Sequence, residues 1–363
     1  MDRLSDFRIK IDAIRSILKT KGFDGIEIKS QTNFSYVTRG RGFIGLASVM
    51  ACASLFITNN RVVLVGENID AQRIFDEQLL SNPDIDLMIF PWDEPDHRNV
   101  IVESFAKNLK IATEVDLEHE LYEIRTRLSE YDMDAFRELG KEAATIIENI
   151  CKQLKKGIRE YELAGEISKQ LWEKNIEPIT LLVAFDGRGQ KYRHPVMVEN
   201  RLENYALVGI CGRRNGLIVS LTRDVLLKHD AEIMDHHSKC IRVNASFWNK
   251  LKPGTSVSEV FAAGVAQYGI EGYPLEYKEH HQGGLTGFIP RELRASFESK
   301  HVIRSGEAYA FNPTLKSAKV EDTVLVTNNG LEILTYTGNY SYENCTIMGK
   351  NINVPTVFVI EGN

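Results

Sequence analysis

Two short segments of the chain carry residue types that could do chemistry together. Residues 279–284 place His280 and His281 before a double glycine, and residues 320–323 place Glu321 beside a second acid on a predicted strand. Imidazole nitrogens and carboxylate oxygens bind divalent cations, and histidine also carries protons near neutral pH. These are the residue types of one half of a metal-dependent hydrolase site.

The pattern of apolar residues along the chain predicts two domains, as expected for 363 residues. Residues 1–125 alternate helix and strand patterns, which predicts an α/β domain. Residues 126–363 open with long helical stretches and continue with strands and helices, which predicts an α+β fold class for the larger domain. The catalytic residue types all lie in this second domain.

Two glycine junctions suggest an internal duplication in the second domain. Gly157 is followed by Glu162, and Gly254 is followed by Glu259, each time between a long helical stretch and a shorter one. Glycine ends a helix, and an acid in the first turn of the next helix is favoured by the helix dipole. We infer a duplicated helix–helix–strand (ααβ) unit.

Composition excludes several classes of protein. The net charge of -6 argues against nucleic-acid binding, which needs clustered lysine and arginine. No apolar run approaches the roughly 20 residues that span a bilayer, so no membrane partner is expected. The five cysteines are dispersed, which is typical of reduced thiols and predicts a cytoplasmic protein.

Four features together resemble the pita-bread fold shared by methionine aminopeptidase, the Xaa-Pro peptidases and creatinase. With its α/β N-terminal domain, nearly the whole chain is most similar to the Xaa-Pro peptidase and creatinase branch. This resemblance implies duplicated ααβ units around a curved antiparallel sheet, hydrolysis of a C–N bond, and a homodimer. The four features are Lys156-Gly157 with Glu162, NGLIVSLTR at 215–223, HHQGG at 280–284, and EDTVLV at 321–326.

The same resemblance implies that most metal ligands are missing. Active peptidases of this family hold two divalent cations with two aspartates, one histidine and two glutamates. Here Gly209 and Ser220 fall on the aspartate positions, His281 on the histidine position, and Asn312 and Glu321 on the glutamate positions. Glycine has no side-chain ligand, and neutral serine and asparagine oxygens do not offset the charge of two cations. We expect a vacated metal site and no cofactor.

Creatinase resembles the peptidases in fold and works without a metal, so it suggests roles for the remaining residues. The family's catalytic histidine matches His194, which would transfer a proton. His281 would orient the substrate or stabilise developing charge, and Glu321, with Asp224, would bind a cationic group. His280 is expected to contact the substrate.

Three further residues are candidate substrate contacts. Arg39 and Arg41 follow the strand-like residues 34–37, and in creatinase-like dimers an N-terminal arginine can reach the partner's site. Asn312, on a vacated ligand position, would also face the substrate. His236 and His237, near Cys240 on a predicted helix, are read instead as a solvated helix face.

Three functions remain open from the sequence. The leading hypothesis is a cytoplasmic, homodimeric, metal-independent hydrolase acting on a C–N bond of a small amino-acid-like, guanidino or dipeptide substrate. One alternative is a catalytically inactive homologue that binds peptides or proteins. The other is a Xaa-Pro aminopeptidase or dipeptidase that retains a single metal.

Overall fold

The structure, a computed structural model, describes residues 1–316 and 318–360. It divides into two compact units: Met1–Tyr131 with Asn215–Leu217, and Asp132–Arg214 with Ile218–Asn363. In the ranges that the structure describes, none of the helices combines the length and the apolar character that a membrane span requires.

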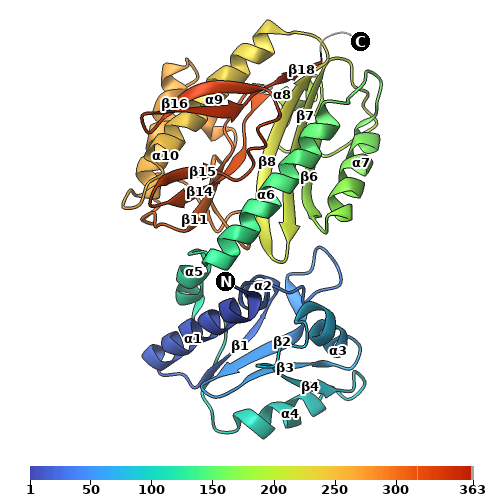
Figure 1. The fold of residues 1–363 in the computed structure, drawn as a ribbon, viewed down its shortest axis with the longest axis vertical. Helices are drawn as coiled ribbons and strands as arrows, with labels where there is room; N and C mark the ends of the chain where they lie inside the picture. The colour runs from blue at the N-terminus through green and yellow to red at the C-terminus, as the bar shows by residue number, and fades with distance from the viewer. Residues whose placement is uncertain (317, 361–363) are drawn as a thin grey trace. The chain divides into compact units, whose positions relative to one another are not determined.

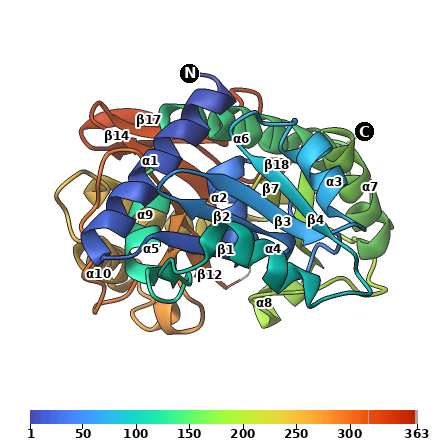
Figure 2. The same cartoon turned by 90° about the horizontal axis from the view of Figure 1, so that it is seen from below.

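The first unit is built on a mixed five-stranded sheet with the strand order β4-β3-β2-β1-β5. Neighbours β1–β2 and β2–β3 are antiparallel, whereas β3–β4 and β1–β5 are parallel. Helices cover the sheet (Figure 1, Figure 2). The elements are α1 (Arg3–Lys21), β1 (Gly25–Ser30), α2 (Gln31–Thr38), β2 (Met50–Thr58), β3 (Val62–Glu67), α3 (Ala71–Arg73), the π-helix η1 (Ile74–Gln78), β4 (Asp86–Phe90), α4 (His97–Ala106), β5 (Ile111–Ala112) and α5 (Glu118–Arg125).

Side chains of the strands point alternately to the two faces of this sheet, and helices cover both faces. Phe56 and Val63 face α4, where they pack with Phe105. Successive side chains of a strand point to opposite faces, so Leu55 and Ile57 face the other side, where α1 contacts β2. Both faces of β2 and its neighbours therefore carry apolar side chains.

Residues 34–37 are helical, so their interpretation as a strand was wrong. The hydroxyl of Ser30 accepts a hydrogen bond from the backbone N–H of Asn33 and caps α2. Arg39 ends the helix in the left-handed conformation, with φ of 58°. The cap outweighs the β preference of the aromatic and branched residues, because propensity is only a weak local influence.

The second unit repeats one order of elements twice: two helices and then antiparallel strands. Figure 1 shows α6 and α7 beside the sheet of β6 to β8, and α9 and α10 beside the strands that follow. The elements are α6 (Glu130–Cys151), α7 (Glu160–Glu173), β6 (Glu177–Phe185), α8 (Arg188–Lys191), β7 (Tyr205–Arg214), β8 (Leu217–Leu226), α9 (Ala231–Lys250), α10 (Val257–Ile270), the short helix η2 (Glu276–Lys278), β9 (Gly283–Thr286), β10 (Leu293–Arg294), β11 (Glu307–Phe311), β12 (Thr314–Leu315), β13 (Ala318–Lys319), β14 (Asp322–Thr327), β15 (Gly330–Ile333), β16 (Tyr342–Ile347), β17 (Lys350–Pro355) and β18 (Phe358–Val359).

The two glycine junctions form as the sequence predicts. Gly157 and Gly254 have φ of 87° and 90°, which glycine adopts without steric cost. After each glycine a helix begins with its first-turn acid in place: Glu162 accepts from the backbone N–H of Arg159, and the backbone N–H of Glu259 donates to a capping serine. The duplicated ααβ order is confirmed.

A backbone bridge joins the two large sheets of this unit. One sheet has the order β18-β8-β7-β6 and the other β10-β9-β11-β14-β15. Thr222 on β8 pairs with Glu321, just before β14, across an isolated antiparallel bridge. The bridge brings Glu321 beside the strands that carry Gly209 and Ser220.

Candidate active site

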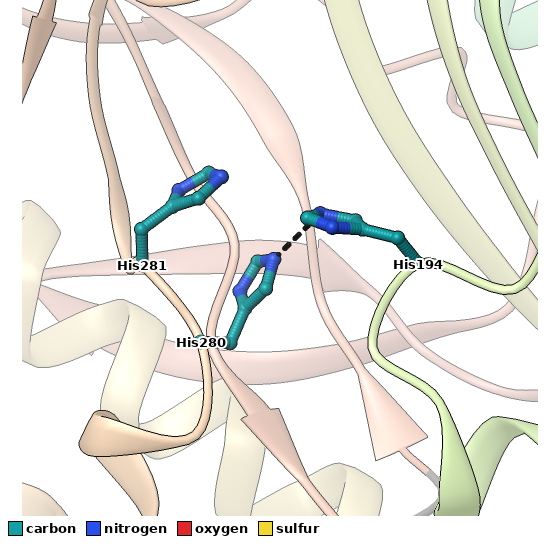
Figure 3. Close-up of side chains that lie close together, drawn as sticks. All are labelled: His194, His280 and His281. Carbon is teal, nitrogen blue, oxygen red and sulfur yellow. Dashed lines mark hydrogen bonds between the residues drawn. The ribbon is translucent and has the colours of Figure 1, made fainter.

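Three histidines from two separate loops meet in the second unit (Figure 3). His194 lies on the loop after α8, and His280 and His281 lie just before β9. Nε2 of His194 and Nε2 of His280 are 2.9 Å apart, and the ring centroids of His194 and His281 are 5.8 Å apart. One ligand atom from each of the three lies within 4.8 Å of the others.

Paired glycines determine where His280 and His281 can lie. Gly283 has φ of 90°, and a Cβ there would lie 2.1 Å from the carbonyl oxygen of Ala310 on β11. Gly284 has φ of 148°, and a Cβ there would lie 2.1 Å from the carbonyl oxygen of Leu293 on β10. Only glycine allows three backbones to approach this closely, so the double glycine anchors the histidines at the start of β9.

An ion pair holds the His194 loop against the segment that carries the other two histidines. Arg193 donates from Nη2 to Oε1 of Glu276, at 2.6 Å, and Glu276 lies in η2 just before His280. Both side chains are largely buried, at 19% and 12% exposed. The contact explains why loops far apart in sequence present their imidazoles to one another.

The three imidazoles are neutral at neutral pH. Burial, together with the charge of Lys319, lowers the pKa of His280 to about 2 and holds that of His194 below its usual value. Burial and Arg291 lower the pKa of His281 to about 4. Each neutral ring carries one N–H and one lone pair. The lone pair of His281 accepts from the backbone N–H of Gly283, so a lone pair for proton transfer is left on His194 or on His280, whichever ring donates in their mutual hydrogen bond.

Glu321 is held by two cations and a hydroxyl. Nη2 of Arg291 donates to Oε1 of Glu321, while Nη1 of Arg291 lies 3.3 Å from Oγ of Ser220. Nζ of Lys319 is 3.9 Å from Oε2 of Glu321, and Thr222 donates to the same oxygen at 3.2 Å. Burial would raise the pKa of Glu321, but Lys319 and Arg291 lower it, so the carboxylate is ionised.

These groups line one cavity of ≈ 360 Å³. This volume lies in the range of small-molecule sites, roughly 300–1,000 Å³. The wall is part apolar, from side chains of β6 and β7 and from Ile289 and Pro290. Its polar and charged side chains are Thr180, His194, Cys211, His281, Arg291, Arg294, Asn312, Lys319 and Glu321.

Most of the predicted site residues come together here. His194, His281, Asn312 and Glu321 line the cavity, as does Gly209, and His280 touches both other histidines. Ser220 lies directly behind, in contact with Arg291. Bringing these residues together is a property of the fold, and their roles remain predictions.

Asp224 does not reach the cavity, which corrects its assignment as a substrate contact. Its side chain is 1% exposed and accepts from the backbone N–H of Lys319 at 3.2 Å. Its carboxylate also accepts a hydrogen bond from Tyr205, and Nε2 of His237 lies 3.8 Å away. Asp224 lies on the same face of β8 as Thr222, but one alternation further along, where the segment of Lys319 covers it.

The helix that carries His236 and His237 is not solvated at these positions, so that interpretation was also wrong. The two residues are only 7% and 3% exposed. His237 lies next to Asp224, and Cys240 is fully buried on the same helix, α9. His236 contacts Tyr273 instead of Asp224, so the two neighbouring histidines of α9 have different surroundings.

Arg39 and Arg41 belong to the first unit. Arg39 is 4% exposed and lies over the ring of Tyr131, 6.0 Å from its centroid. The backbone N–H of Arg41 donates to Oε1 of Gln78 at 3.1 Å. Contact of either arginine with a substrate stays a prediction.

The cavity also contains cations that the sequence analysis did not identify. The sequence does indicate that Lys319 could lie near Glu321, because it stands two residues before it and side chains two apart lie on the same side of an extended chain. No feature of the sequence around Arg291 indicates that its guanidinium reaches Glu321. Nor does any feature around Arg294, which is exposed, indicate that it lies at the cavity wall.

The residues present do not fit a pair of divalent cations. Of the five ligand positions implied by resemblance, only Glu321 offers a carboxylate and only His281 an imidazole. Two metal ions need several anionic oxygens to balance their charge. Here the guanidinium of Arg291 lies between Glu321 and Ser220, two of those ligand positions, so a cation there would meet positive charge instead of carboxylates.

A comparison with protein families assigns the chain to a family. Residues 134–328 match the model of metallopeptidase family M24, which is more than half of the chain. The chain belongs to this family. The membership confirms the predicted relationship to Xaa-Pro peptidases, the pita-bread fold class, and the interpretation of the protein as a member of a hydrolase family.

Known relatives are distant in sequence but similar in fold. The chain is 20% identical over 356 residues to the uncharacterized peptidase YqhT of Bacillus subtilis, covering 90% of this chain and 98% of that protein. The prolidase of Pyrococcus horikoshii superimposes with a TM-score of 0.74 at 17% identity, covering 90% of this chain and 98% of the prolidase. The N-terminal domain of the FACT complex subunit SPT16 of chickpea also matches, with a TM-score of 0.69 at 12% identity, covering 93% and 97%.

Proposed function

We propose that this M24 protein is a hydrolase that cleaves a C–N bond in a small peptide-like substrate without a bound metal. One observation carries the proposal: His194, His281 and Glu321 line a single cavity together with Arg291 and Lys319. The cavity thus holds proton acceptors beside fixed positive charge, which are the two requirements for attack of water on an amide.

The proposed step uses the side chains of this chain and one water molecule. Neutral His194 takes a proton from the water as its oxygen bonds to the amide carbon, and the carbonyl electron pair moves to the oxygen. The oxyanion is stabilised by Arg291 and by His281. The oxyanion electron pair then re-forms the carbonyl as the C–N bond breaks, and the proton on His194 passes to the leaving nitrogen. The products are a carboxylic acid and an amine, which become a carboxylate and an ammonium by transfer of the acid proton.

A peptide-like substrate suits the site better than a guanidino compound. Glu321 already binds Arg291 and lies beside Lys319, so a substrate guanidinium would have to displace a cation of the protein. The earlier expectation that Glu321 binds a cationic group is therefore replaced by pairing within the protein. The cavity volume of ≈ 360 Å³ suits a dipeptide, and the prolidase name of a structural neighbour makes Xaa-Pro dipeptides the first compounds to test.

The test is hydrolysis of a dipeptide panel, including Xaa-Pro dipeptides, with protein purified without chelator and assayed with and without EDTA. We expect turnover that EDTA does not change and that His194→Ala abolishes, while metal analysis finds less than one ion per chain. Stoichiometric metal with EDTA-sensitive cleavage would overturn metal independence. A lack of turnover across the panel would favour the peptide- or protein-binding alternative.

The homodimer and cytoplasmic residence also stay proposals. Light scattering of the purified protein tests the first, and cell fractionation tests the second. We expect a mass of twice the 41.1 kDa of one chain.

A further inference from the structure

We propose that Arg291 and Lys319 form a binding site for an anion at the place where metal-binding members of the family would hold cations. Its ligand class is a compact oxyanion, such as inorganic phosphate or the tetrahedral anion formed during amide hydrolysis. The catalytic meaning of the site rests on the proposed function, but anion binding can be measured without turnover.

Arg291 and Lys319 lie beside residues that stand at the family's metal-ligand positions. Arg291 donates to Glu321 and contacts Ser220, and both residues fall on metal-ligand positions by resemblance. Its side chain is 9% exposed and that of Lys319 is 4% exposed. Two protein cations therefore occupy the region between the former ligands, at the wall of the cavity.

The cavity wall carries more positive than negative side chains. The ionised groups that line the cavity are Arg291, Arg294, Lys319 and Glu321, three cations against one anion. Glu321 is the one carboxylate that Arg291 and Lys319 share, so positive charge remains in excess at the cavity wall and attracts an anion. Asp224 lies outside the cavity lining, where its carboxylate accepts from the backbone N–H of Lys319.

Two polar side chains of the cavity wall can hydrogen-bond to a bound molecule. Nδ1 of His281 accepts from the backbone N–H of Gly283 at 3.3 Å, so the neutral ring carries its proton on Nε2. Nε2 is then a donor on a residue that lines the same cavity as Arg291, which suits an oxyanion and not a metal ion. Asn312, 2% exposed, also lines the cavity, and its Oδ1 has no partner among the described residues. An N–H group of a substrate could donate to it.

The experiment is calorimetric titration of the full-length protein with inorganic phosphate. Wild type is compared with Arg291→Gln, and Arg242→Gln is the matched control, because Arg242 lies on the surface of α9 with its side chain 43% exposed. We expect the affinity for phosphate to fall at least about tenfold in Arg291→Gln, since a hydrogen bond to a charged group contributes roughly 1.5–3 kcal/mol. The control should bind as wild type.

Folding and competing ligands are checked in the same series. Arg291→Lys keeps the charge, so it should bind phosphate more tightly than Arg291→Gln if the variants unfold at similar temperatures. Equal phosphate affinity in wild type and Arg291→Gln would overturn the proposal. So would stoichiometric binding of Mn²⁺ or Zn²⁺ that Glu321→Gln abolishes.

The outcome for this site is separable from that for the proposed function. Phosphate binding that needs Arg291, in a protein that hydrolyses no dipeptide, would support the anion site and remove the hydrolase. Hydrolysis that is indifferent to phosphate and to Arg291→Gln would support the hydrolase and remove the anion site.

Discussion

Glu321→Gln removes the negative charge that two buried cations share. The side chain of Glu321 is 6% exposed, and those of Arg291 and Lys319 are 9% and 4% exposed. Removing one partner of a buried ion pair leaves the other charge uncompensated, which costs about 3–5 kcal/mol. We therefore expect the free energy of unfolding to fall by about 3–5 kcal/mol, a drop in melting temperature on the order of 10 °C for a unit of this size.

The assay is thermal and urea unfolding followed by circular dichroism in phosphate-free buffer. Glu332→Gln is the matched control, because Glu332 pairs with Arg137 where both side chains are about 40% exposed. An exposed pair contributes at most about 1 kcal/mol, so the control should be nearly silent.

A double variant separates the ion pair from other effects of the substitution. Glu321→Gln with Arg291→Gln should be more stable than Glu321→Gln alone, since one of the unpaired cations is gone. A loss below about 1 kcal/mol in Glu321→Gln, or no recovery in the double variant, would refute the reasoning.

Three further predictions test the catalytic base, the buried acid and the glycine anchor. His194→Ala should lower kcat for the best dipeptide by about 10²–10⁴, with unchanged melting temperature, and an unaltered kcat would exclude its role as base. Burial raises the pKa of Asp224 to about 7, so its stabilising contribution is complete below its unfolded pKa near 4 and is lost as pH rises through 7. Urea unfolding at about pH 5 and pH 8 should show that the free energy of unfolding falls between the two pH values in wild type, and that Asp224→Asn removes this part of the fall. The same fall in both proteins would contradict the prediction. His237, whose pKa burial lowers to about 3, contributes equally in both proteins. Gly283→Ala should cost at least about 2 kcal/mol because its Cβ meets a backbone oxygen, whereas Gly157→Ala, with similar φ and open space, should cost about 1 kcal/mol; equal losses would refute the close-packing argument.

Local sequence was sufficient for much of the fold. Gly157 and Gly254 each predicted a helix junction from backbone freedom and first-turn acids, and both form. The double glycine at 283–284 is a local feature of the same kind, since it allows the close backbone approaches that the structure contains on both sides. Such features depend on the residue and its nearest neighbours, so a single sequence reveals them.

Local patterns gave the wrong prediction in two places, once because a local cap was overlooked and once because a remote strand buries the residue. Residues 34–37 have strand-forming side chains, but the cap from Ser30 makes them helical. His237 resembles a solvated helix residue, yet it is buried next to Asp224, which comes from a strand. The Ser30 cap could have been found in the local sequence, whereas no periodicity around His237 indicates the strand that buries it.

The sequence by itself, through its resemblance to the family, indicated three residues of the cavity and the residue types that stand at the family's ligand positions. His194, His281 and Glu321 could be named from their motifs, and their meeting in one cavity follows from the family fold. Only the tertiary structure showed what takes the place of the missing ligands. Arg291 reaches Glu321 from a different loop. Such a contact between distant segments depends on how the chain packs, and the spacing of residues along the sequence does not reveal it.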